Sequence, residues 1–275
     1  GDVYTFQFKA FDYDAIADKW GSSYLPSETL DYVAWGLPSG LSLDSSGLLA
    51  GTLENEDVGV HQFTVQVTDK SGATDQKTFE IIVNNINDAP VFDFTPPTET
   101  DEDAPFSYQL TATDMDMDVV DNETLTYEAV NKPDWMSVSS SGLITGTPSN
   151  DDVDSHSVTV QVRDSAGAID QKTFSLTVNN TNDAPVFDFT PPTYTDEDAQ
   201  FSYQLTANDM DSDVASETLR FEALEKPDWL TLSYDGLITG TPSNSDVGSH
   251  EIYITVTDSG GASDYWQDTI VVHNT

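Results

Sequence analysis

Asn84-Asn85-Ile86-Asn87-Asp88-Ala89-Pro90-Val91-Phe92 occurs twice in this chain, the second time as Asn179-Asn180-Thr181-Asn182-Asp183-Ala184-Pro185-Val186-Phe187. The copies lie 95 residues apart (183 − 88 = 95), and residues 143–150 and 237–244 share Leu-Ile-Thr-Gly-Thr-Pro-Ser-Asn at a spacing of 94 (237 − 143 = 94). A repeat of this length indicates tandem copies of one structural unit. We therefore predict three domains, residues 1–88, 89–183 and 184–275.

Within each unit, apolar residues alternate with polar ones. The clearest runs of the second unit contain Val158, Val160 and Val162, and then Phe174, Leu176 and Val178. A period of two marks half-buried strands, and the turn Asp164-Ser165-Ala166-Gly167 between the runs indicates a hairpin. Several short strands per unit predict an all-β fold of three tandem Ig-like antiparallel β-sandwiches with Greek-key connections.

The first unit differs from the other two. A loop inserted at about residues 15–26 carries Trp20 and Tyr24, which have no counterparts in the later units. This aromatic pair is explained either by a loop that packs on itself or by contact with a sugar or a partner. The first unit also starts inside its first alternating run, and the third stops before the next Asn-Asp-Ala-Pro segment is due. We expect a segment of a longer array, with an N-terminally truncated first repeat.

The composition is strongly acidic. Among 275 residues there are 49 acidic and 9 basic ones, which gives a net charge of −40 at pH 7. Nucleic acids and anionic membrane surfaces bind basic patches, so neither is expected as a partner. The absence of cysteine excludes disulfides, and no apolar run approaches the roughly 18 residues that span a bilayer. A solvated surface explains part of the charge, but crowded acids favour divalent counterions.

Acidic residues recur at matching places in the units. An acidic group precedes the first strand of the later units, as Asp101-Glu102-Asp103 and Asp196-Glu197-Asp198. An Asp-X-Asp pair follows that strand in every unit: Asp12 and Asp14, Asp114 and Asp116, and Asp209 and Asp211. Alternate strand residues point to the same side, so each pair can turn two carboxylates toward one cation. Calcium accepts about six to eight oxygen ligands in irregular geometry, whereas magnesium demands a strict octahedron.

Other functional motifs find no support. The segment that starts at Asp114 is not an EF-hand, because Val119 and Leu125 occupy its glycine and glutamate positions. The sequence has no Gly-X-Ser-X-Gly elbow, no cysteine nucleophile and no His-Glu-X-X-His motif, so we do not expect an enzyme. One equivalent histidine per unit, at positions 61, 156 and 250, indicates a packing or hydrogen-bonding role.

The chain resembles the cadherin family over essentially its whole length, and most closely the bacterial and dystroglycan-type cadherin-like repeats. Residues 110–116, Leu-Thr-Ala-Thr-Asp-Met-Asp, look like the cadherin strand-end motif. Residues 87–92 resemble the cadherin linker, and residues 142–148, Gly-Leu-Ile-Thr-Gly-Thr-Pro, are similar to the dystroglycan-type variant. Asn85 and Asn180 stand where the cadherin linker has an acid, which implies fewer calcium ions at each junction.

The resemblance implies calcium sites between neighbouring domains. The junction of the first two domains would use Asp57, Asn85, Asn87, Asp88, Asp114, Asp116 and Asp164. The junction of the second and third would use Glu102, Asp152, Asn180, Asn182, Asp183, Asp209, Asp211 and Asp258. Asp12, Asp14 and Asp69 are the equivalent ligand-type residues of the first domain.

The expected function is therefore a calcium-stiffened rod from an extracellular, secreted or cell-surface protein such as a bacterial adhesin. Its partners would be neighbouring repeats of the same chain and a surface glycan or another cell-surface protein. The alternative is a carbohydrate-binding module of a secreted or surface protein, which depends on Trp20 and Tyr24. An enzyme is the third and least supported possibility.

Overall fold

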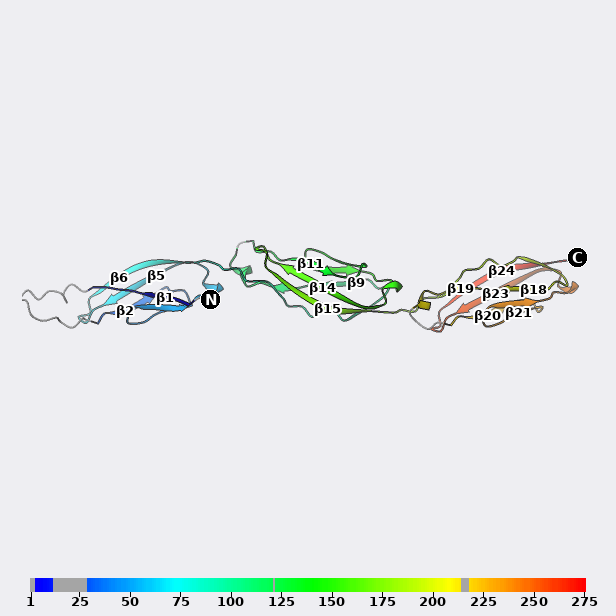
Figure 1. The fold of residues 1–275 in the computed structure, drawn as a ribbon, viewed down its shortest axis with the longest axis horizontal. Helices are drawn as coiled ribbons and strands as arrows, with labels where there is room; N and C mark the ends of the chain where they lie inside the picture. The colour runs from blue at the N-terminus through cyan, green and yellow to red at the C-terminus, as the bar shows by residue number, and fades with distance from the viewer. Residues whose placement is uncertain (1–2, 12–28, 121, 214–217) are drawn as a thin grey trace, which may run out of the picture.

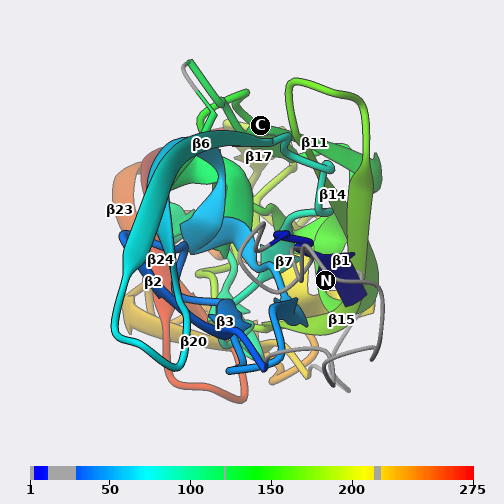
Figure 2. The ribbon, with the colours of Figure 1, turned by 90° about the vertical axis from the view of Figure 1, so that its left-hand side faces the viewer.

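The computed structural model describes residues 3–11, 29–120, 122–213 and 218–275. Three β-sandwiches follow one another along a single long axis (Figure 1), and from one end they lie one behind another (Figure 2). The helical elements of the described residues are short 3-10 turns, and none of these is long and apolar enough to cross a membrane. The prediction of three tandem all-β sandwiches is confirmed.

The second domain contains a four-stranded sheet of order β11-β14-β15-β8 and a three-stranded sheet of order β12-β13-β9, while β7 pairs with β10. Its strands are β7 (Val91–Phe92), β8 (Glu99–Asp101), β9 (Phe106–Gln109), β10 (Ala112–Thr113), β11 (Thr126–Asn131), β12 (Met136–Val138), β13 (Leu143–Gly146), β14 (Asp154–Arg163) and β15 (Ile169–Asn179). Two 3-10 turns, η3 (Met115–Asp118) and η4 (Asn150–Asp152), lie at its two ends.

The third domain repeats this arrangement, with the sheets β20-β23-β24-β17 and β18-β22-β21 and the pair β16-β19. Its strands are β16 (Val186–Phe187), β17 (Tyr194–Asp196), β18 (Phe201–Gln204), β19 (Ala207–Asn208), β20 (Arg220–Glu225), β21 (Leu230–Leu232), β22 (Leu237–Gly240), β23 (Gly248–Thr257) and β24 (Ser263–His273). Its 3-10 turns are η5 (Met210–Asp213) and η6 (Asn244–Asp246).

The first domain has two three-stranded sheets among its described residues, β2-β5-β6 and β1-β4-β3. Its strands are β1 (Val3–Gln7), β2 (Asp31–Trp35), β3 (Leu41–Leu43), β4 (Leu48–Thr52), β5 (Gly59–Thr68) and β6 (Thr74–Val83), and η2 covers Asn55–Asp57. No strand of the described residues pairs with the outer edge of β6.

The alternating sequence pattern places one face of each strand in the core. In β14, Val158, Val160 and Val162 are fully buried, whereas Thr159 faces outward and its hydroxyl lies 2.9 Å from that of Thr173 in β15. Full burial of a valine or leucine side chain contributes about 1.5–3 kcal/mol to folding. The strands therefore form because one face can pack between the two sheets while the other remains polar.

Two strand pairs are parallel, which the prediction of antiparallel sandwiches did not include. Short strand β8 runs parallel to the end of β15, and β17 runs parallel to the end of β24. Immediately after these strands the backbone turns through a left-handed conformation at Asp103 (φ 55°) and Asp198 (φ 58°). This arrangement brings Glu102 and Glu197 to the same end of each domain as the last residues of β15 and β24.

The glycine of the repeated Leu-Ile-Thr-Gly segment lies where two strands approach closely. A Cβ atom on Gly146 would lie 2.3 Å from the carbonyl oxygen of Trp135 and 2.7 Å from its ring, and Gly240 has the same relation to Trp229. Trp135 also packs edge-on against Phe106, with ring centroids 5.9 Å apart. The glycine thus allows the tryptophan to cover the edge of the core.

Candidate metal centres

At the junction of the first and second domains, three chain segments meet around Asp116. The side chain of Asp116 is buried, and the backbone N–H of Asp88 in the linker donates to its Oδ2 at 2.7 Å. From the η2 turn of the first domain, Asn55 Nδ2 donates to Asp88 Oδ2 at 2.9 Å and to Asp116 Oδ1 at 3.3 Å. The N–H of Asp116 donates to Asp114 Oδ1 at 2.9 Å. The first domain, the linker and the second domain are thereby connected.

The junction of the second and third domains repeats this arrangement. The N–H of Asp183 donates to Asp211 Oδ2 at 2.6 Å, and the N–H of Asp211 donates to Asp209 Oδ1 at 2.9 Å. Asn150, the counterpart of Asn55, donates from Nδ2 to the carbonyl of Met210. The linker and the η4 and η5 turns therefore enclose one acidic region.

Glu102 joins this second junction through the linker. Its side chain is 2% exposed, and its Oε1 accepts a hydrogen bond from the N–H of Thr181 at 2.7 Å. Burial, followed by the charges of Asp211 and Asp183, raises the pKa of Glu102. Burial and the nearby Asp211 likewise raise the pKa of Asp183. These shifts mean that the protein environment disfavours the ionised carboxylates.

Each linker also contacts an aspartate in the hairpin that follows β14 or β23 of the next domain. Asn87 Nδ2 donates to Asp164 Oδ2 at 2.8 Å, and Asn182 Nδ2 donates to Asp258 Oδ2 at 2.9 Å. Burial raises the pKa of Asp164, but hydrogen bonds from Asn87 and from the hairpin amides lower it more, so the net shift is downward. The two linker asparagines thus anchor the hairpins that follow β14 and β23.

Several buried oxygens at both junctions receive no hydrogen bond from the part of the protein that the structure describes. At the first junction they are Asn85 Oδ1 and Asp114 Oδ2. At the second they are Glu102 Oε2, Asn150 Oδ1 and Asp211 Oδ1. A buried acceptor without a donor costs about 1–3 kcal/mol, and more when it is charged. Carboxylate and amide oxygens are the ligands that a hard cation requires, so this donor set fits calcium.

The sequence of each domain matches one family model. Residues 2–84, 89–179 and 184–273 match the family described as "Putative Ig domain" (He_PIG). The chain belongs to this family. The segments between the matches contain Asn85, Asn87 and Asp88 in the first linker and Asn180, Asn182 and Asp183 in the second. No curated protein matches the sequence significantly.

The three Ig domains also resemble solved cadherin ectodomains. The structure of PcdhgB3 EC1-4 is 15% identical, with a TM-score of 0.55, and the match covers 90% of this chain and 67% of that one. Protocadherin Gamma B2 extracellular cadherin domains 1-5 are 15% identical, with a TM-score of 0.53, and the match covers 90% of this chain and 53% of that one. At these identities the likeness shows the fold of the tandem Ig domains.

Two of the predicted ligands, Asp57 and Asp152, make hydrogen bonds within their own domains. The Asp57 carboxylate accepts hydrogen bonds from Ser39 Oγ at 2.8 Å and from the N–H of Glu54 at 3.1 Å, inside the first Ig domain. Asp152 Oδ2 similarly accepts from the N–H and hydroxyl of Ser149 at 2.9 and 2.8 Å. These carboxylates cap their 3-10 turns, and their role as junction ligands stays a prediction.

Asn55 and Asn150, two residues earlier, donate hydrogen bonds to groups across the junctions, and the sequence prediction included neither of them. Their recurrence at a spacing of 95 (150 − 55 = 95) was an available signal.

The remaining predicted residues are less closely joined to the centres. Asn180 is exposed on its linker. Asp69 accepts from Ser71 Oγ and the N–H of Ala73, both at 2.8 Å, in the exposed hairpin between β5 and β6. Asp12, Asp14, Trp20 and Tyr24 lie outside the described residues. Among the described residues, no three His, Cys, Asp or Glu side chains lie close enough together to form a complete metal site. The junction carboxylates accept hydrogen bonds from asparagine side chains and backbone N–H groups instead.

Proposed function

We propose that calcium binds at the two junctions and holds the three Ig domains as an extended, stiff rod. The observation that carries the proposal is the set of buried oxygens without donors at both junctions, which includes Asp114 Oδ2, Glu102 Oε2 and Asp211 Oδ1. The first set combines oxygens from the linker and the second domain, and the second set combines oxygens from the second and third domains. A cation held by such a set would oppose any rotation of one domain against the next.

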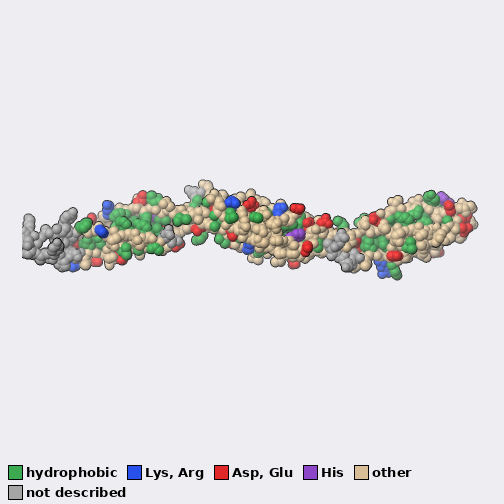
Figure 3. Space-filling model, viewed as in Figure 1, with side chains coloured by type: hydrophobic (Ala, Val, Ile, Leu, Met, Phe, Trp, Pro, Cys, Tyr) green, Lys and Arg blue, Asp and Glu red, His purple; other side chains and the backbone are tan. Residues whose placement is uncertain are grey.

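The electrostatics support a divalent ion. Burial, followed by the charge of Asp116, raises the pKa of Asp114, as burial and neighbouring acids do for Glu102 and Asp183. The chain has 49 acidic and 9 basic residues, and acidic side chains are visible on all three domains in Figure 3. Among the described residues, no lysine or arginine forms an ion pair with the junction acids. A bound cation would therefore remove repulsion that the protein does not neutralise with its own basic side chains.

We further propose that this rod belongs to an extracellular or cell-surface protein and serves adhesion or the extension of an adhesive region, without catalysing a reaction. The tandem Ig-domain architecture with its cadherin-like fold supports this proposal. An extracellular location also suits a calcium-dependent rod, because calcium is plentiful there. The proposed partners are neighbouring repeats of the same chain, together with a surface glycan or a second surface protein. The Leu-Ile-Thr-Gly-Thr-Pro repeat favours the bacterial dystroglycan-type variant.

Chelation tests the proposal on the intact chain. With millimolar calcium we expect a longer maximum dimension in small-angle X-ray scattering and a higher melting temperature than with a chelator. Magnesium at the same concentration should reproduce little of either change, because it holds its waters and demands octahedral geometry. Equal dimensions and equal melting temperatures with calcium and with chelator would contradict the proposal.

A pair of substitutions in one turn separates ligation from bulk charge. Asp116 is buried and faces the linker, whereas Asp118 is exposed two residues later in η3. We expect Asp116→Asn to lower calcium affinity at the first junction by about tenfold or more, which corresponds to about 1.4 kcal/mol. Asp118→Asn removes the same charge and should leave affinity nearly unchanged. Isothermal titration calorimetry measures both, and equal effects would indicate nonspecific screening.

A further inference from the structure

Three tyrosine side chains lie on the outer face of the sheet β20-β23-β24-β17 of the third domain. They are Tyr194 in β17, Tyr253 in β23 and Tyr265 in β24. The next residue of each strand faces the interior, so each tyrosine points outward; these next residues are Thr195, Ile254 and Trp266. Tyr194 is 62% exposed and Tyr265 is 67% exposed. Apolar surface that gathers on one exposed face commonly marks a binding site.

The second domain has polar residues at the same three places. The repeat spacing aligns Tyr194 with Glu99 (194 − 95 = 99), and it aligns the other two tyrosines with Thr159 and Gln171 (253 − 94 = 159, 265 − 94 = 171). Glu99 and Gln171 are exposed although one domain precedes the second domain and another follows it. The fold therefore leaves these positions open to solvent, and packing of the core does not require the tyrosines of the third domain.

Tyr253 and Tyr265 form the first aromatic cluster of this face. Their rings meet edge to face, with centroids 5.7 Å apart and planes at 90°. In the register of β23 and β24, Tyr253 lies opposite Gln267, and Thr255 lies opposite Tyr265. Ring faces carry negative charge density that attracts C–H groups, and amide and hydroxyl groups both donate and accept hydrogen bonds. Four adjoining positions thus combine stacking surfaces with hydrogen-bonding groups.

Tyr194 and His273 form the second aromatic cluster. Their rings stack with centroids 5.4 Å apart and an angle of 15° between the planes, and His273 Nδ1 lies 3.8 Å from Asp196 Oδ1. Tyr194 pairs with Val271, six residues after Tyr265 in β24 (271 − 265 = 6). The two clusters are therefore about 20 Å apart at about 3.4 Å per residue, so a ligand that contacts both must be long.

The charges on this face disfavour an anionic ligand. The sequences of the four strands contain one arginine and no lysine, and the guanidinium of that residue, Arg220, lies 4.4 Å from the ring centroid of Tyr234. Asp196, Glu222 and Glu251 are exposed at outward positions of the same sheet. Sulfate, phosphate or carboxylate groups on a ligand would be repelled there. The face therefore suits a neutral ligand.

We propose that this face binds a neutral, linear glycan along β24. The polar side chains of Gln267 and Thr269 lie between the two aromatic clusters, whereas a protein interface has an apolar centre inside a polar rim. A glycan chain carries both C–H faces and hydroxyl groups, so its sugars would stack on Tyr265 and Tyr194 while Gln267 binds hydroxyls between them. This inference deepens the proposed adhesive function, on which it rests, by naming a ligand class and its site.

The second domain supplies the substitutions that test the site, because the fold already accepts its residues at these positions. The probes are four neutral β-1,4-linked hexasaccharides: cellohexaose, mannohexaose, xylohexaose and chitohexaose. We expect the full chain to bind at least one of them in isothermal titration calorimetry, and the double variant Tyr253→Thr, Tyr265→Gln to bind it at least about tenfold more weakly. Dextran sulfate, an anionic glycan, should not bind.

Tyr234→Ser is the matched control. Tyr234 is also an exposed tyrosine, at 69%, and Ser140 is its counterpart in the second domain (234 − 94 = 140). It lies in the turn between β21 and β22, beyond the edge strand β20 and away from β24, so its substitution should leave the affinity unchanged. No binding of any hexasaccharide, or equal affinity of the double variant and the unmodified chain, would overturn the site. Capture of a protein through these tyrosines without affinity for any hexasaccharide would overturn the glycan assignment.

Ligand length tests whether the glycan follows β24. Tyr194→Glu introduces the residue of the second domain at the second cluster. We expect it to weaken binding of the hexasaccharide by about threefold or more, because one of two linked contacts is lost, and to leave the much weaker binding of the corresponding disaccharide unchanged. Any other result, including equal effects on both lengths, would overturn the placement along β24.

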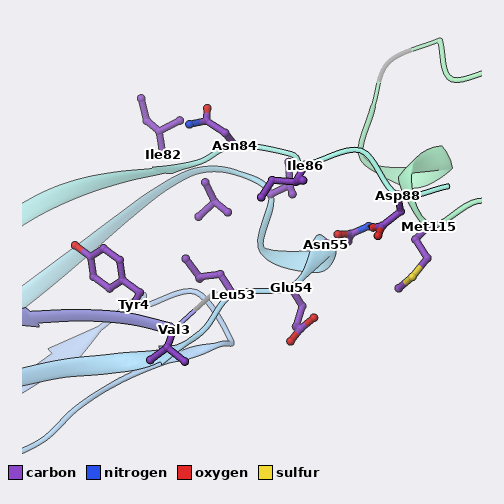
Figure 4. A pocket seen from close by; sticks show the side chains of 12 residues that line it. Val3, Tyr4, Leu53, Glu54, Asn55, Ile82, Asn84, Ile86, Asp88 and Met115 are labelled. Atoms are coloured by element: carbon purple, nitrogen blue, oxygen red, sulfur yellow. The ribbon is translucent and has the colours of Figure 1, made fainter. Parts of the chain in front are cut away.

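Chelation separates this inference from the role of calcium. The candidate metal centre at the first junction, where Asn55 and Asp88 lie together (Figure 4), shares no residue with the aromatic face. Hexasaccharide affinity should therefore be the same in calcium and in chelator, and a loss of binding in chelator would contradict an independent site. If calcium neither extends nor stabilises the chain while the glycan binds, the calcium proposal alone fails. If calcium acts as expected and no glycan binds, this inference alone fails.

Discussion

Glu102→Gln is expected to change the stability of the second domain in opposite directions with and without calcium. In the absence of calcium, the folded-state pKa of Glu102 is raised by burial and by nearby acids. A carboxyl group with a raised folded-state pKa contributes no penalty while it is protonated, and it destabilises the fold as the pH rises through that pKa. At neutral pH, glutamine removes this cost and keeps an oxygen for the N–H of Thr181, so the melting temperature in chelator should rise or stay constant.

With calcium the sign reverses. Glutamine offers the cation no formal charge, and we expect affinity at the second junction to fall by about tenfold or more. Melting in saturating calcium should then occur at a lower temperature than for the unmodified chain. Asp101→Asn is the matched control, because Asp101 is the preceding residue and is exposed, and its Oδ1 accepts a hydrogen bond from Asn179 Nδ2 at 3.1 Å. A uniform shift with and without calcium would refute the proposed ligand role.

Gly146→Ala is expected to destabilise the second domain by about 2–3 kcal/mol through overpacking. The added methyl group would lie 2.3 Å from the carbonyl oxygen of Trp135, which is backbone and cannot rotate away. Either β12 and β13 must separate or Trp135 must move off the core. Hydrogen exchange of the Val160 amide at equilibrium measures this loss within the second domain.

Gly167→Ala provides the control for this substitution. Gly167 has a φ of 99°, with nothing within 4 Å of the position of a Cβ atom. Alanine there meets only the backbone penalty, about 1 kcal/mol. Because Gly146 lies outside the left-handed region, its larger expected cost isolates the close approach of the strands. Equal costs at the two positions would show that the contact with Trp135 has little energetic effect.

Much of the fold was predictable because its signals are periodic. Alternation in Val158, Val160 and Val162 requires only that one face of a strand be buried, and the structure buries all three completely. The parallel strands β8 and β17 were not predicted, since each covers three residues and shows no alternation long enough to detect. Their pairing depends on the ends of β15 and β24, which are remote in sequence.

The details of the candidate site were harder to predict. Asp57 and Asn55 lie in the same 3-10 turn and recur equally well among the repeats. Composition favoured the aspartate as a calcium ligand. The turn geometry directs its carboxylate back to the N–H of Glu54 and leaves Asn55 at the linker. Side-chain direction within a turn is therefore the information that a repeat pattern does not contain.

The parallel pairing of β8 with β15 has a mechanical consequence. The chain passes from the first linker through β7 to β8 and leaves the second domain through the end of β15, so tension that reaches β8 pulls these two parallel strands in opposite directions along a shared axis. The bonds from Thr177 to Thr98 and from Glu102 to Asn179 then carry the load together in shear, instead of opening one after another. In the second domain, β8 therefore resists a pulling force once the short pair of β7 and β10 has opened.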